Sequence, residues 1–174
     1  FHDKGFDVIG IDNNLRKFFF GDSGSTNWIK SKLLKRNKRF KNYSIDIRNH
    51  NALDKIFKKY SKSISIIIHC AAQPSHDYGK NFPFLDFNIN ATGTLNLLEL
   101  TKKYCSNSPF IFMSTNKVYG DNPNKLKLFE KKTRWELKKN DKNFRGIKEN
   151  FPIDNAIHSF FGVSKTYADL IVQE

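Results

Sequence analysis

Four short apolar segments alternate with segments of helical length, and this alternation constrains the fold more than any other feature. The apolar segments lie at residues 6–12, 43–48, 66–68 and 109–115. An order of strand, helix and strand is typical of a parallel sheet with helices on both faces. The sequence therefore predicts an α/β protein with a doubly wound parallel sheet.

The segments between the apolar runs predict helices and one long excursion. A helix is expected from about residue 26, with Ser25 or Thr26 as its N-cap. "NALDKIFKKY", "FNINATGTLNLLELTKKYC" and "FFGVSKTYADLIVQE" predict three further helices. Residues 66–68 are continuously apolar, which predicts a central strand buried on both faces. Residues 122–150 are polar and lysine-rich with few periodic signals, so we expect them to run over the surface near the site.

Both ends of the chain lack the signals that usually begin or end a secondary-structure element. "FHDKGF" suggests the end of a helix that leads into a strand, and "IVQE" stops inside a helix without a terminating glycine or proline. We therefore expect residues 1–174 to be part of one domain, without its first β-turn-α unit and without the segment after the last helix. Such a part is expected to be inactive by itself.

Composition limits the partners. The net charge of +13 would suit a polyanion, but the lysines are spread along the whole chain. The densest basic segment, residues 30–41, interleaves leucine with charge as a solvated helix face does. We expect no nucleic-acid partner. No apolar run approaches the roughly 18 residues needed to span a bilayer, so a cytoplasmic protein without membrane contact is expected. Cys70 and Cys105 have no metal-ligand spacing, and no metal is expected.

Three predicted strand ends carry groups that suit a dinucleotide. Asp12 can accept hydrogen bonds from both hydroxyls of an adenosine ribose, or it can cap a turn. Its charge disfavours a 2'-phosphate, which favours NAD over NADP, with Arg16 as the nearby residue that can weaken this preference. Asp46 and the backbone of Ile47 can bind the adenine edge, although a surface ion pair of Asp46 with Arg48 explains "DIR" equally simply. The small residues of "HCAAQPS" allow a dinucleotide to lie close to the backbone.

The fourth strand and the last helix carry a second set of polar groups. Ser114 and Thr115 follow the strand directly, and a hydroxyl there can polarise the oxygen of an alcohol or ketone substrate. Lys165 can hydrogen-bond the hydroxyls of the nicotinamide ribose. Together they predict a site for hydride transfer.

Six motifs in order resemble a known family. "GIDNN", "DIR", "HCAAQPS", "NINATGTLNLLE", "STNKVYGD" and "HSFFGVSK" cover nearly the whole chain. They resemble the extended short-chain dehydrogenase/reductases, and within them the NAD-dependent epimerase/dehydratase family that acts on nucleotide sugars. "AAQPSHD", "STNKVYGD" followed by "KTRWE", and "HSFFGVSK" are most similar to epimerases of CDP-linked sugars. The resemblance implies a Rossmann-like fold, NAD as cofactor, a nucleotide sugar as substrate and epimerisation through a transient keto sugar. It leaves a homo-oligomer open.

The resemblance also implies roles for individual residues. Thr115 matches the catalytic serine or threonine, and Lys165 matches the catalytic lysine. The implied substrate-binding residues are Ser75, Asn116 and Lys117. The implied cofactor-binding residues are Asp12, Asn13, Asp46, Ile47, Ala71, Ala72, Gln73, Asn90 and Lys165. The glycine-rich turn of the family has no counterpart among the 174 residues.

One position departs from the family in a way that affects the chemistry. Phe161, four residues before Lys165, occupies the place of the catalytic tyrosine and cannot exchange a proton. We expect another group to replace the phenol. His158 is the first candidate, because histidine titrates near neutral pH, and Tyr119 is the second. Two alternatives stay open: a related dehydratase or reductase, and a module that binds NAD or a nucleotide without turnover.

Overall fold

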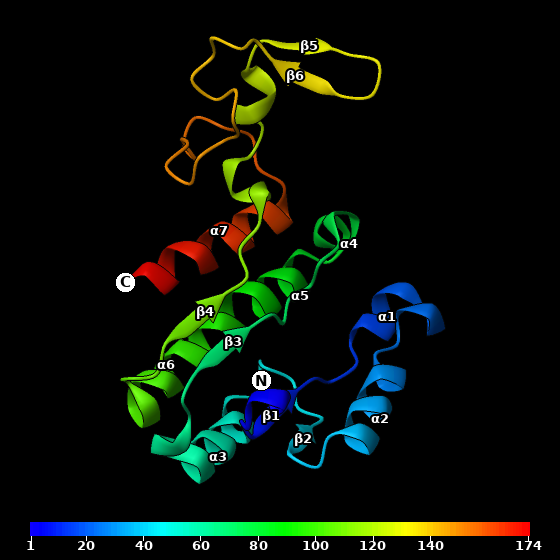
Figure 1. Cartoon of the computed structure of the whole chain (residues 1–174), viewed down its shortest axis with the longest axis vertical. Coiled ribbons are helices and arrows are strands. Elements are labelled where there is room, and N and C mark those ends of the chain that lie inside the picture. Colours follow the sequence, from blue (N-terminus) through cyan, green and yellow to red (C-terminus); the bar gives the residue numbers. More distant parts are fainter.

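The computed structural model describes all 174 residues and shows an α/β chain (Figure 1). None of the helices combines the length and the hydrophobicity that a membrane span requires. The strands are β1 (Val8–Ile11), β2 (Phe40–Tyr43), β3 (Ile67–His69), β4 (Phe110–Phe112), β5 (Leu128–Glu130) and β6 (Trp135–Leu137). The α-helices are α1 (Arg16–Phe20), α2 (Asn27–Arg36), α3 (His50–Tyr60), α4 (His76–Asn81), α5 (Pro83–Phe87), α6 (Gly93–Cys105) and α7 (Phe160–Gln173). The shorter helical turns are η1 (His2–Lys4), η2 (Asp22–Gly24), η3 (Ser61–Ser63), η4 (Asn88–Thr92), η5 (Asn116–Tyr119) and η6 (Asn122–Lys125).

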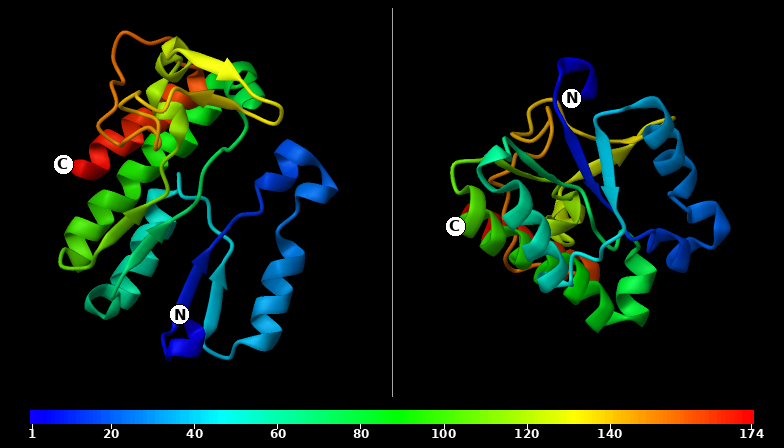
Figure 2. Two further views of the ribbon diagram at one scale, coloured as in Figure 1. Left: turned by 45° about the horizontal axis from the view of Figure 1, so that its top comes forward. Right: turned by 90° about the horizontal axis from the view of Figure 1, so that it is seen from below.

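Four strands form two parallel pairs, as the alternation predicts. In the first pair Ile11 of β1 lies opposite Tyr43 of β2, and in the second Ile67 of β3 lies opposite Phe110 of β4. The two pairs are separate two-stranded sheets. Figure 2 shows the two strand pairs apart from each other, with α2 beside the first pair and α3 and α6 beside the second. The loops that follow β1, β2 and β3 line one common cavity.

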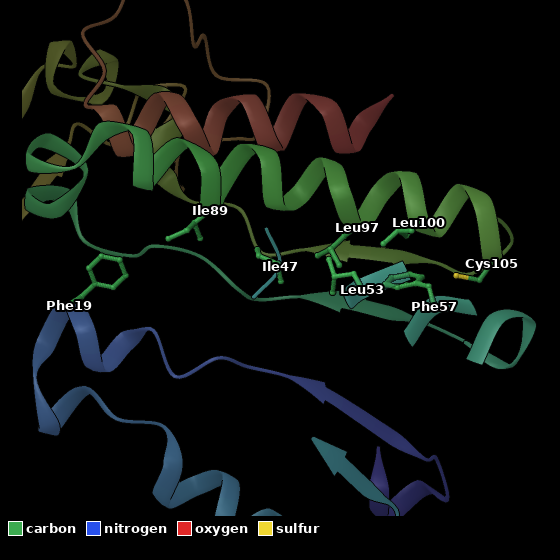
Figure 3. Close-up of a cluster of buried hydrophobic side chains, with 8 residues drawn as sticks. All are labelled: Phe19, Ile47, Leu53, Phe57, Ile89, Leu97, Leu100 and Cys105. Atoms are coloured by element: carbon green, nitrogen blue, oxygen red, sulfur yellow. The ribbon is translucent and has the colours of Figure 1, made fainter. Parts of the chain in front are cut away.

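The core lies mainly between α3, α6 and the second strand pair (Figure 3). Leu53 and Phe57 come from the buried face of α3, the helix that "NALDKIFKKY" predicts. Leu97 and Leu100 of α6 pack against them, since helix positions three or four apart share a face. The eight buried members are Phe19, Ile47, Leu53, Phe57, Ile89, Leu97, Leu100 and Cys105.

The second strand lies earlier than predicted. β2 spans Phe40–Tyr43, whereas the sequence pattern suggested residues 43–48. The N–H of Ile45 donates to the carbonyl of Tyr43 at 3.0 Å, and the N–H of Asn49 donates to the carbonyl of Asp46 at 2.9 Å. These local bonds turn the chain away from β1, so Asp46 lies in a loop beyond the strand.

The prediction of a central strand at residues 66–68 is wrong for this structure. Ile68 of β3 is 41% exposed, and its register partner Ile111 of β4 is 44% exposed. β3 is hydrogen-bonded only to β4, and Ile68 and Ile111 share a face that the core does not cover. A continuously apolar run therefore did not guarantee burial on both faces.

The polar excursion contains a hairpin that the sequence pattern did not reveal. β5 and β6 are antiparallel, with Leu128 opposite Leu137. Every residue of β5 is exposed. The strand therefore has no buried face that would show as an alternation of apolar and polar residues in the sequence. The excursion lies at one end of the molecule (Figure 1), above the beginning of α7.

The predicted long helix and the last helix are both present. The helical path runs through α5, the π-helical η4 and α6. The last helix, α7, begins at Phe160, and the hydroxyl of Ser159 caps it by accepting from the N–H of Gly162 at 3.0 Å. Thr26 occupies the N-cap position of α2, but its hydroxyl donates to neighbouring side chains and does not cap the helix.

Candidate functional site

A cavity of about 260 Å³ lies where the loops after β1, β2 and β3 meet. Asp12, Asn13, Asp46, Ala71 and Ala72 all line it, so the structure brings these predicted cofactor-binding residues together. Since the carboxyl ends of parallel strands form the ligand-binding edge of such sheets, the position of the cavity is the expected one.

Asp12 organises the turn after β1. Its Oδ1 accepts from the N–H of Asn14 at 2.6 Å and from the hydroxyl of Thr26 at 3.0 Å. Asn14 has a φ of 58°, in the left-handed region that asparagine tolerates. Asp12 Oδ2 forms no hydrogen bond within the chain, so the carboxylate can cap the turn and still accept from a ligand.

Asp46 forms the ion pair that the simpler interpretation predicts. Its carboxylate lies 2.6 Å from Arg48 Nη2, and Asn13 Nδ2 donates to Asp46 Oδ2 at 2.8 Å. Hydrogen bonds from the Arg48 guanidinium lower the pKa of the Asp46 carboxyl against the opposing effect of its partial burial. The Ile47 side chain lies in the core, and its carbonyl accepts from Asn96 at 3.0 Å. Adenine binding by Asp46 and Ile47 stays a prediction.

Gln73 and Asn90 face the interior instead of the cavity. Asn90 Oδ1 accepts from the N–H of Gln73 at 2.9 Å, and Gln73 Nε2 donates to Asp86 Oδ2 at 2.7 Å. Both side chains are 1% exposed. They support the loop that carries Ala71 and Ala72, and direct contact of either side chain with NAD stays a prediction.

Lys165 is buried at the end of β4. Its Nζ donates to the carbonyl of Met113 at 2.7 Å and lies 3.9 Å from the centre of the Phe112 ring. Burial lowers the pKa of the Lys165 ammonium to about 8, and the nearby Asp169 and Cys70 act in the opposite direction. Cys70 lines the cavity, whereas Lys165 is not among the residues that line it.

Thr115 follows Met113 by two residues and caps η5. Its Oγ1 accepts from the N–H of Lys117 at 3.3 Å. Asn116 and Lys117 are exposed on this turn, and Ser75 caps α4 by accepting from the N–H of Tyr78 at 3.3 Å. The substrate-binding roles of Ser75, Asn116 and Lys117 stay predictions.

Phe161 is buried on α7, with 9% of its surface exposed. The turn after β4 packs tightly on this helix, since a Cβ at Gly162 would lie 3.0 Å from the carbonyl oxygen of Lys117. His158 Nε2 is 2.9 Å from the carbonyl of Ile153, while its Nδ1 is buried without a partner. A carbonyl can only accept, so Nε2 carries a proton, and in a neutral imidazole Nδ1 is then the accepting nitrogen.

Tyr119, the second candidate, and Tyr167 on α7 carry the phenols nearest to Phe161 in the sequence and differ in their surroundings. The Tyr119 hydroxyl donates to the carbonyl of Lys148 in the excursion at 3.3 Å. Tyr167 packs on Phe87, with 5.7 Å between ring centres, and it lies away from the Phe161 face as its helical position predicts.

Three buried polar residues were not singled out by the sequence. His69 of β3 is 2.9 Å from the hydroxyl of Thr94, and burial lowers the pKa of the His69 imidazole to about 4. Asp86 and Ser164 form a buried contact between α5 and α7. His69 and Ser164 lie within two of the motifs and Asp86 lies outside them, but the sequence does not reveal their partners, since Asp86 and Ser164 are 78 positions apart in the chain.

Comparison with known proteins reveals clear relatives. The family described as GDP-mannose 4,6 dehydratase matches residues 1–136. The chain is 37% identical over 166 residues to CDP-paratose 2-epimerase of Salmonella typhi, which covers 95% of the chain and 44% of that protein. The chain thus spans less than half the length of this relative.

Solved structures agree on the fold. The UDP-Glc/GlcNAc 4-epimerase of Campylobacter jejuni superimposes with a TM-score of 0.71 at 20% identity, over 99% of this chain and 42% of that one. The dTDP-glucose 4,6-dehydratase of Bacillus anthracis, solved in complex with NAD, gives a TM-score of 0.61 at 26% identity, over 97% of this chain and 41% of that one. The architecture is therefore Rossmann-like, as the motif order implied.

Proposed function

The chain belongs to the NAD-dependent epimerase/dehydratase family, and from this premise we propose that the whole protein is an NAD-dependent nucleotide-sugar epimerase. The observation that carries the proposal is the buried Lys165, held on the Met113 carbonyl two residues before Thr115. Burial of a lysine ammonium costs free energy of folding. Buried ionisable groups of this kind cluster at functional sites.

The residues around the cavity fit a dinucleotide. Asp12 Oδ2 is free to accept from ribose hydroxyls, and Ala71 and Ala72 leave room for close approach of a ligand to the backbone. Asp12 would also repel a 2'-phosphate, which supports NAD over NADP. NAD, when bound, supplies a hydride acceptor that can return the hydride to either face of a ketone.

Lys165 and Thr115 have complementary tasks in this proposal. With its pKa near 8, the Lys165 ammonium is mostly charged at neutral pH and can donate to ribose hydroxyls beside the Met113 carbonyl. The Thr115 hydroxyl lies at the end of the same strand and can donate to the sugar oxygen that becomes a carbonyl oxygen. Both groups orient the reacting carbon.

His158 is the proposed proton acceptor in place of the phenol. Its Nδ1 has a free lone pair, and the Nε2 contact with the Ile153 carbonyl fixes this tautomer. The residue sits directly before the helix that carries Phe161 and Lys165. Nδ1 is buried in the free chain, so base catalysis by this imidazole requires Nδ1 to become accessible when the substrate binds.

We further propose that the substrate is a CDP-linked sugar, by analogy with the Salmonella typhi relative, which is 37% identical over 95% of the chain. A second candidate function is a module that binds NAD without turnover, and the observation that favours it is Phe161 itself.

A single assay separates the two functions. The whole protein with bound NAD is mixed with CDP-sugars and, in parallel, with UDP-sugars, and the absorbance of reduced nicotinamide and exchange of label between sugar and cofactor are followed. We expect a small transient reduction and label exchange with a CDP-sugar. Tight NAD binding without reduction by any nucleotide sugar would support the binding module instead.

A further inference from the structure

Asp86 of α5 has the most concentrated set of buried polar contacts in the chain. It is 1% exposed, and its three side-chain partners all donate to it. Ser164 donates to Oδ1, Gln73 donates to Oδ2 at 2.7 Å, and Asn90 donates to Oδ2 at 3.4 Å. No lysine or arginine pairs with this carboxylate.

The partners come from separate parts of the fold. Gln73 lies in the loop after β3, Asn90 in the π turn η4, and Ser164 on α7. Asn90 closes the set, because its Nδ2 also donates to Ser164 Oγ at 3.0 Å and its Oδ1 accepts from the Gln73 N–H. Asp86 is therefore the centre of one continuous network.

This network joins the two halves of the proposed site. Ser164 directly precedes Lys165, and its hydroxyl also lies 3.1 Å from the carbonyl of Phe161. Gln73 directly follows Ala71 and Ala72, which line the cavity. A displacement at Asp86 would thus move the lysine on one side and the cofactor loop on the other.

Close packing leaves this part of the chain little room to adjust. A Cβ at Gly79 of α4 would lie 3.0 Å from Asp86 Oδ2 and 3.1 Å from the backbone nitrogen of Phe161. Helices α4, α5 and α7 therefore meet around the carboxylate.

Stability alone does not explain a carboxylate at this place. Burial raises the pKa of the Asp86 carboxyl, against the hydrogen bonds from Ser164, Gln73 and Asn90, so the charged form is penalised by the site. Apolar residues of similar volume often replace buried charged groups without loss of stability. A satisfied polar network instead specifies one arrangement of the elements that it connects.

We propose that Asp86 is a positioning residue that sets α7, with Lys165, against the cofactor loop of Ala71 and Ala72. The effect of Asp86 on catalysis rests on the proposed function. Its effect on the position of α7 and Lys165 does not depend on that function. It assigns to Asp86 no contact with substrate or cofactor.

The test follows Lys165 directly, without need of turnover. Lysine side chains of the protein are labelled with ¹³C at the ε position, the Lys165 resonance is assigned with Lys165→Arg, and its titration is recorded by NMR. In the native protein we expect a midpoint near the pKa of about 8. Ser164→Ala and Asp86→Asn loosen α7 and admit water, so the midpoint should rise by about one unit toward that of an ordinary lysine.

A matched control separates positioning from general destabilisation. Thr101 of α6 is also buried, and its hydroxyl donates only to the carbonyl of Leu97 in its own helix, at 2.7 Å. Thr101→Val should lower thermal stability without moving the Lys165 midpoint. The double variant Asp86→Asn/Ser164→Ala should show a shift smaller than the sum of the two single shifts, because both changes act on the same hydrogen-bond network.

Turnover is the second readout. If the proposed function is correct, Ser164→Ala should lower kcat about 10-fold or more, since small misplacements of catalytic groups reduce rates strongly. A shifted midpoint without turnover in any variant or in the native protein would refute the proposed function and leave the positioning role standing. An unchanged midpoint and unchanged kcat in folded Ser164→Ala would overturn the positioning role.

Discussion

The loops after β1 and β2 keep their polar groups accessible, whereas α7 and the end of β4 keep theirs inside. Asp12 is exposed and has one carboxylate oxygen free, while Lys165 is 4% exposed and its Nζ donates to the Met113 carbonyl beside the Phe112 ring. An exposed carboxylate can adjust to a ligand at little cost. A buried ammonium is fixed before any ligand arrives, which is the condition for preorganised catalysis.

The two regions should therefore respond differently to substitution. Changes in the buried region should act mainly on the rate of the reaction, and changes in the exposed loops should act mainly on ligand affinity. Four variants examine this difference, in order of expected effect.

Lys165→Met should have the largest effect. We expect turnover of the whole protein to fall about 10³-fold, because the substituted side chain can neither orient the ribose nor supply its charge. Lys103→Met is the control, since Lys103 pairs with Asp54 on the surface at 2.8 Å. Steady-state kinetics measure both, and equal turnover in the two variants would mean that burial of Lys165 has only a structural role.

His158→Ala should lower turnover about 10²-fold if the imidazole accepts the proton. Phe161→Tyr should leave turnover similar or raise it, because a phenol then lies four residues before Lys165. His76→Ala, at an exposed histidine, is the matched control. If His158→Ala retains full turnover, the proton passes to another group such as Tyr119.

Asp12→Asn should act on affinity and leave the rate at saturating NAD largely unchanged. Loss of the charged acceptor should weaken NAD about 10-fold, and the preference over NADP should shrink. Isothermal titration of both cofactors measures this, with Asp22→Asn as the control, because Asp22 pairs with Lys17 outside the cavity. A native preference for NADP would show that Arg16 dominates the pocket.

The smallest effect concerns stability and pH. Folding lowers the pKa of Lys165 from its ordinary value to about 8, so the unfolded chain holds this proton more tightly. The free energy of unfolding should therefore gain from Lys165 as pH rises through the interval between about 8 and the ordinary lysine pKa of about 10.4.

Because water still screens part of the charge, we expect this gain to be roughly 1 to 2 kcal/mol. Denaturant unfolding of the native protein and of Lys165→Met, compared at pH 7 and at the alkaline end of the interval, measures it. The contributions of the other titrating groups to the free energy of unfolding cancel when the two proteins are compared. A constant difference across the interval would contradict the lowered pKa.

Much of the site could be predicted from sequence because it follows local order. Asp12, Ala71 and Thr115 each follow a strand, and parallel strands bring their carboxyl ends to one edge whatever the rest of the chain does. Asn13 and Asp46 line the same cavity for this reason. The helix boundaries at His50 and Phe160 follow equally local signals, the caps Asn49 and Ser159.

Other features could not be predicted from the periodicity of apolar residues. The strand β2 ended early because local hydrogen bonds near Tyr43 competed with pairing to β1. Ile68 remained exposed because its run of apolar residues has core on only one face. Periodicity describes the chain alone, so it cannot report what covers each face.

The class of fold, the order of the motifs and the absence of a phenol at Phe161 follow from residue type and spacing alone. The packed structure was needed to reveal that Gln73 and Asn90 turn inward to Asp86, that Lys165 is held on the Met113 carbonyl, and that His158 Nδ1 is buried without a partner. Burial and hydrogen-bond partners depend on residues that lie far apart in the chain. They are defined only when the helices and strands have packed together.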